Sequence, residues 1–75
     1  MAHVIEFVTD WLADLEKSPG QPLERLLLRS GTRRRARLRA RILPGRWGPV
    51  EAADLSFEDG TTALGVPYAA FTFID

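Results

Sequence analysis

The sequence predicts an α+β fold: one N-terminal amphipathic helix packed on a small antiparallel meander sheet, or on a partly open barrel, of four to five strands. Three observations predict it. Apolar residues near the N-terminus recur at spacings of one, three and four, as on one side of a helix. Residues 35–42 alternate strictly between arginine and apolar side chains, which is typical of a half-buried strand. Two glycine-containing segments, 30–32 and 59–60, join later segments into hairpins.

The predicted helix covers residues 3–17. One apolar stripe is formed by Val4, Ile5, Phe7, Val8, Trp11, Leu12 and Leu15, and the charged side chains of Glu6, Asp10, Asp14 and Lys17 lie away from it. The helix is expected to end at Ser18-Pro19-Gly20, because proline cannot continue the hydrogen-bond ladder. The stripe is wide for so small a protein, which leaves two interpretations: it belongs entirely to the core, or part of it contacts a partner.

The remaining chain predicts five strands, at residues 23–29, 33–43, 50–58, 61–66 and 71–74. A proline- and glycine-rich loop at 44–49 separates the second strand from the third. The Asp59-Gly60 pair predicts a tight turn between the third and the fourth. Pro67 ends the fourth strand, and a single tight turn at 68–71 leads into the last one.

The last third of the chain resembles the second half of SH3-like or Tudor-like small barrels. The resemblance rests on two strands joined by FEDGTT, followed by GVPYAAF and a short final strand. The predicted helix and the arginine-rich strand are not part of that pattern. The resemblance therefore carries no functional residue to this chain.

Length and composition indicate one small folded domain, residues 1–75. The chain has 75 residues, 45% of them hydrophobic and 27% charged, which is ordinary for a globular protein. It has no cysteine, so disulfides and thiolate metal sites are excluded. The N-terminal segment carries acidic residues where a signal peptide needs basic ones, and no apolar run approaches the roughly 20 residues that span a bilayer. We expect a cytoplasmic protein.

The formal net charge of zero conceals three blocks of different sign. Residues 1–24 hold five acids and one lysine (net −4), residues 25–46 hold nine arginines and no acid (net +9), and residues 47–75 hold five acids and no base (net −5). Any electrostatic function must therefore reside in the middle block.

The middle block supplies the candidate binding residues. Alternate arginines of one strand form a row about 20 Å long, with donors suited to carboxylates or phosphates. Only Asp54 and Glu58 are placed to face that row, so we expect a residual positive surface, although the row is also explained as a solvated face without a partner. Trp47 either stacks on a partner or closes the end of the core. The candidate partner-binding residues are Arg33, Arg35, Arg37, Arg39, Arg41, Arg46 and Trp47.

The sequence favours binding over catalysis. His3 is the single histidine and lies beside the N-terminus, and no nucleophile, metal-ligand or phosphate-loop spacing occurs, so we expect no enzyme, cofactor or metal. We expect a small regulatory module that docks an acidic protein surface or a second copy of itself through the arginine-lined strand. The alternative is a nucleic-acid-binding domain that uses the same arginines with Trp47. A membrane is not expected as a partner.

Overall fold

The computed structural model describes residues 1–75 and is all-β. The predicted α+β class is therefore wrong. Seven strands and one 3-10 turn make up the fold, and no helix in it is long and apolar enough to cross a membrane. The elements are β1 (Ala2–Phe7), β2 (Trp11–Glu16), β3 (Glu24–Leu28), β4 (Arg33–Leu43), β5 (Val50–Phe57), β6 (Thr62–Pro67), η1 (Tyr68–Ala70) and β7 (Phe71–Phe73).

The predicted helix over residues 3–17 is replaced by β1 and β2. Ile5 and Phe7 are buried two positions apart in β1, and Ala13 and Leu15 are buried two positions apart in β2. A three-residue corner, 8–10, lies between the two strands, and the helical spacing arises when Val8 and Leu12, which are exposed, are counted with the buried residues. The valine, isoleucine and aromatic content of this segment suits strands better than a helix.

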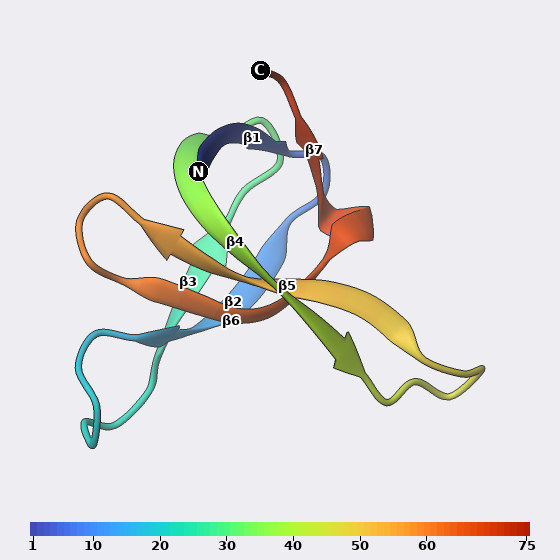
Figure 1. The fold of residues 1–75 in the computed structure, drawn as a ribbon, viewed down its shortest axis with the longest axis horizontal. Helices are drawn as coiled ribbons and strands as arrows, with labels where there is room; N and C mark the ends of the chain where they lie inside the picture. The colour runs from blue at the N-terminus through green and yellow to red at the C-terminus, as the bar shows by residue number, and fades with distance from the viewer.

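The seven strands form one sheet in the order β3-β2-β6-β5-β4-β1-β7, and all neighbours are antiparallel. The sheet curls into a half-barrel, so that β1 and β2 lie in different parts of it although they are consecutive in the chain (Figure 1). The core fills the concave side, and its largest fully buried side chains are Phe7, Ile5, Leu28, Leu55 and Val66.

The five later strands lie within one residue of the predicted bounds at each end. Between β5 and β6, the Asp59 carboxylate accepts hydrogen bonds from the Thr61 backbone N–H (3.0 Å) and the Thr61 hydroxyl (2.6 Å). Gly60 in the same turn has φ +89°, a conformation that residues with a Cβ rarely adopt. These contacts explain why the Asp59-Gly60 pair predicts a tight turn between the two strands.

β4 is longer than the part of the sheet that surrounds it. On one side it pairs with β1 from Glu6↔Arg33 to Ala2↔Arg37, and on the other it pairs with β5 from residue 36 to residue 43. Residues 38–43 therefore have a neighbouring strand on one side only. With the start of β5 they form a two-stranded arm that projects from the half-barrel (Figure 1). We use the name arm for residues 38–51.

Candidate functional site

The register of β4 places five arginines on its outer face. Ala36 is buried and Leu38 is half-buried on the inner face, whereas the alternating arginines between and around them are exposed. Each outward position is two residues from the next, about 6.6 to 6.8 Å along the strand. These outward residues are Arg33, Arg35, Arg37, Arg39 and Arg41.

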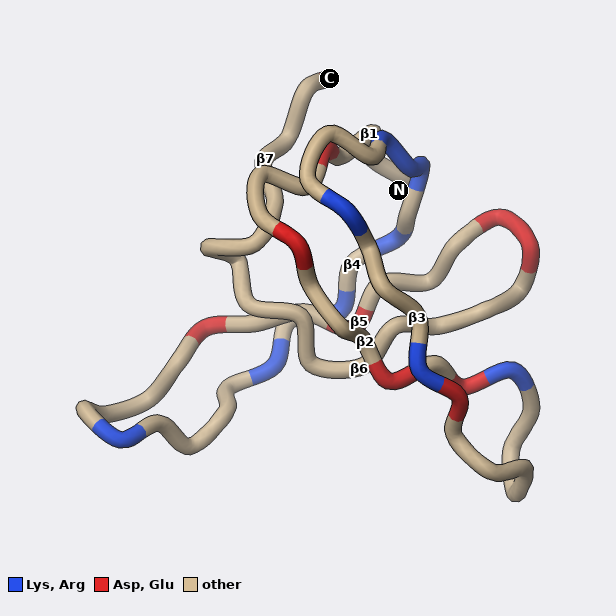
Figure 2. The backbone as a smooth tube through the Cα atoms, turned by 180° about the vertical axis from the view of Figure 1, so that it is seen from behind, with Lys and Arg blue, Asp and Glu red and all other residues tan.

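Carboxylates from neighbouring elements pair with two arginines in the first half of β4. Arg33 Nε lies 2.8 Å from Glu6 Oε1, and Arg35 Nε lies 3.4 Å from Glu58 Oε1. Glu6 was not among the residues expected to face the arginines, because its position depends on the pairing of β1 with β4. In Figure 2, basic and acidic segments are interspersed through the fold, although they are separated along the sequence.

A third pair involves a buried carboxylate in β5. Asp54 is 7% exposed, and its Oδ2 accepts a 2.7 Å hydrogen bond from Arg41 Nη2. Its Oδ1 accepts a 2.8 Å hydrogen bond from the Gly65 backbone N–H, where the β5–β6 register shifts and Gly65 adopts φ +61°. Asp54 thus stabilises the register shift between β5 and β6. Arg39, which faces Asp54 in the register, has no ion pair.

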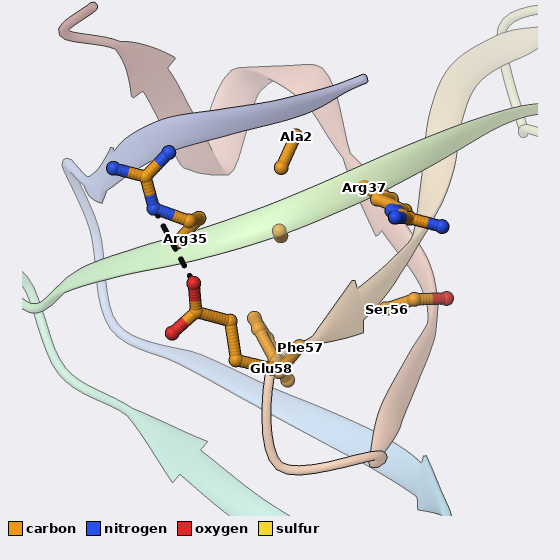
Figure 3. A pocket seen from close by; sticks show the side chains of 7 residues that line it. Ala2, Arg35, Arg37, Ser56, Phe57 and Glu58 are labelled. Carbon is orange, nitrogen blue, oxygen red and sulfur yellow. Dashed lines mark ion pairs between the residues drawn. The ribbon is translucent and has the colours of Figure 1, made fainter.

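Arg37 and Arg39 remain as two adjacent outward guanidinium groups without a carboxylate partner. The cross-strand neighbours of Arg37 are Ala2 on β1 and Ser56 on β5, neither of which is acidic. An open pocket of about 370 Å³ adjoins Arg37 and has Ala36 among its lining residues. Figure 3 shows Arg35 turned toward Glu58, while Arg37 points the other way, beside Ser56.

The loop of the arm presents the two remaining predicted residues. The Arg46 guanidinium lies 5.5 Å from the centre of the Trp47 ring, and Arg46 has no carboxylate partner. Trp47 is 93% exposed. The interpretation of Trp47 as a side chain that closes the core is therefore wrong, and its ring is free to contact a partner.

Arg34 lies on the opposite face of β4 from the outward row. Its guanidinium carbon is 4.4 Å from the centre of the Phe57 ring, and its Nη2 is 3.8 Å from Asp59 Oδ2. The hydrogen bond from the Thr61 hydroxyl, followed by that from the Thr61 N–H and by the nearby Arg34 charge, lowers the pKa of Asp59 from 3.8. Arg34 therefore stabilises the fold through Phe57 and Asp59 and does not belong to the outer arginine row.

The predicted site is thereby narrowed. Carboxylates of the chain pair with three of the site's seven residues, Arg33, Arg35 and Arg41. Arg37 and Arg39 have no such partner. Arg46 and Trp47 are exposed in the loop at the end of the arm.

A comparison of the chain with known protein families, curated proteins and solved structures finds no match.

Proposed function

We propose that this protein is a non-enzymatic binding module that docks an acidic segment of another protein through Arg37 and Arg39. The observation that carries the proposal is the pair of exposed guanidinium groups that no carboxylate of the chain neutralises, beside arginines that are neutralised. Guanidinium groups form strong, charge-assisted hydrogen bonds to carboxylates. The binding would take place in the cytoplasm, the compartment that the sequence led us to expect.

The spacing of the free arginines supports a protein partner. Two side chains about 6.6 to 6.8 Å apart match carboxylates two residues apart in an extended segment. A nucleic-acid backbone presents a longer run of charge, and along β4 it would also pass Arg35 and Arg41, which Glu58 and Asp54 already neutralise. A short acidic segment needs only the two free arginines.

A different protein fits the site better than a second copy of this chain does. Glu16 and Glu51 are the acidic side chains without an ion pair or hydrogen bond, and they lie on β2 and β5. They are not neighbours on one strand, so they do not offer two carboxylates at the spacing of Arg37 and Arg39. Self-association through charge is correspondingly less favoured.

One observation favours a second candidate, nucleic-acid binding. Trp47 is almost fully exposed beside Arg46, and bases stack on such rings with little sequence preference. Against it, these two residues lie in the loop of the arm, while the free pair on β4 is separated from them by the neutralised Arg41.

Fluorescence anisotropy with labelled poly-L-glutamate and with labelled short single-stranded and duplex DNA, over a series of salt concentrations, tests the proposal. We expect poly-L-glutamate to bind, with an affinity that falls as salt rises. The double variant Arg37→Gln/Arg39→Gln should lose that binding, and Trp47→Ala should keep it. Tighter binding of DNA that Trp47→Ala abolishes would establish the second candidate instead. Absence of binding to either probe at low salt would overturn both.

A further inference from the structure

We propose that the acidic partner binds as an added β-strand along the free edge of β4, residues 38–43. Its side chains would alternate between acidic residues that face Arg39, next to Arg37, and apolar residues that face Ala40 and Ile42. This inference rests on the proposed function and specifies the conformation and the side-chain pattern of the partner.

The backbone of this segment is available for pairing. The pairing of β1 with β4 covers residues 33–37, and β5 occupies the other side of β4, so residues 38–43 carry one edge that no strand of the structure pairs. An unpaired edge presents alternating N–H and C=O groups that an extended peptide satisfies by strand addition. The segment contains no proline that would remove a donor from the edge.

The side chains of this segment present two different faces to such a strand. Arg39 and Arg41 lie on the outer face, while Ala40 and Ile42 lie on the inner face, where both are exposed and Ile42 reaches 63%. A pocket of about 250 Å³ is lined by Ala40, Ile42, Ala52 and the partly buried Tyr68, with Arg41 and Glu51 as its charged residues. An apolar side chain of the added strand would enter this pocket when the neighbouring acidic side chain meets Arg39.

Charge selects a partner protein over a second copy of this chain. The two edge strands of the sheet are β3 and β7. β3 carries Glu24 and Arg25, which pair with Lys17 and Asp14, and is followed by Arg29, which would repel the arginines of β4; the three residues of β7 carry no charge. Neither strand alternates acidic and apolar side chains. An acidic–apolar extended segment complements both faces of residues 38–43.

Two synthetic peptides of identical composition test the inference: in one, acidic and apolar residues alternate, and in the other the acidic residues are grouped at one end. We expect the alternating peptide to bind about tenfold tighter, as expected for one additional apolar side chain buried. Amide hydrogen exchange should show new protection at alternate residues within 38–43. Ile42→Asp should weaken the alternating peptide by a similar factor, and the matched control Leu27→Asp, which alters an exposed leucine on β3, should not.

The outcomes separate this inference from the proposed function. Equal affinity of the two peptides, or binding of poly-L-glutamate without new protection in residues 38–43, would overturn strand addition and leave the docking function standing. If poly-L-glutamate binds and the alternating peptide does not, strand addition is likewise overturned and the docking function stands. If poly-L-glutamate fails as well, both proposals fall. The peptide comparison uses the unchanged protein, so it does not depend on whether a variant folds.

Discussion

The two halves of β4 share one sequence pattern but differ in their surroundings. Residues 33–35 pair with β1 alone and residues 36–37 with both β1 and β5; the outward arginines at 33 and 35 each have a carboxylate from a neighbouring element, whereas Arg37 has none. Residues 38–43 have β5 alone as a neighbour; Arg39 has no carboxylate there, whereas Arg41 pairs with Asp54 of β5. The difference teaches that the neighbouring strands decide whether an arginine is available to a partner, while the local sequence does not.

The largest expected change in the free energy of unfolding is the difference between a substitution in the body of the sheet and one in the arm. Leu55 is fully buried, and Leu55→Ala should lower the free energy of unfolding by about 2–5 kcal/mol, much of the stability of so small a domain. Ile42 is 63% exposed, and Ile42→Ala should change it by about 0.5 kcal/mol or less. Urea denaturation followed by circular dichroism measures both. Similar losses for the two variants would mean that the arm is packed as tightly as the body.

Asp54 joins the arm to the body, so its removal should have the next largest effect. Asp54→Ala leaves the Gly65 N–H without its acceptor and should cost about 2 kcal/mol. Asp54→Asn keeps an oxygen for that N–H and should cost about 1 kcal/mol. The same denaturation measurement compares the two variants. An equal loss for both would show that the Arg41 pair, and not the Gly65 hydrogen bond, is the main contribution of this carboxylate.

A smaller effect compares a neutralised arginine with a free one. Arg33→Ala removes the 2.8 Å pair with Glu6 and should lower the free energy of unfolding by about 0.5 kcal/mol. Arg39→Ala removes no ion pair and should leave stability unchanged or slightly raised, because repulsion from Arg37 is relieved. Thermal unfolding at low and high salt provides the measurement. A clear loss on Arg39→Ala would show that this residue has a structural partner.

The smallest effect concerns acid stability at the β5–β6 turn. The pKa of Asp59 is lowered from 3.8, so its contribution to stability is present above that value and is lost as the pH falls through the lowered one. Thr61→Val removes the hydroxyl donor and should raise the Asp59 pKa toward 3.8, more than Arg34→Gln does. Carboxyl NMR titration tests this order, and a larger effect of the arginine would reverse it.

The sequence predicted those parts of the fold whose signals are local. Alternation in 33–43, the proline- and glycine-rich loop and the Asp59-Gly60 turn each act over a few residues, and the strands they define are present. The segment 3–17 was misassigned because Val8 and Leu12, which are exposed, combine with the buried residues of two strands to give spacings of three and four. The pairing of β1 with β4 joins residues about thirty positions apart, and no short-range pattern encodes it.

The candidate site was predictable to the same extent. Alternation placed the arginines on one face, and the expectation that Asp54 and Glu58 face them is confirmed. The part played by Glu6 was hidden, because it requires the non-local pairing of β1 with β4. Without it, the sequence could not show which arginines remain free.

The central claim is that the free arginines form the site, and two double variants of equal charge test it most directly. Arg37→Gln/Arg39→Gln and Arg33→Gln/Arg35→Gln each remove two positive charges from the same face of β4. Titration of both with labelled poly-L-glutamate at low salt should show binding lost in the first and largely retained in the second. Equal losses in the two variants would contradict the claim, because total charge alone would then account for the binding.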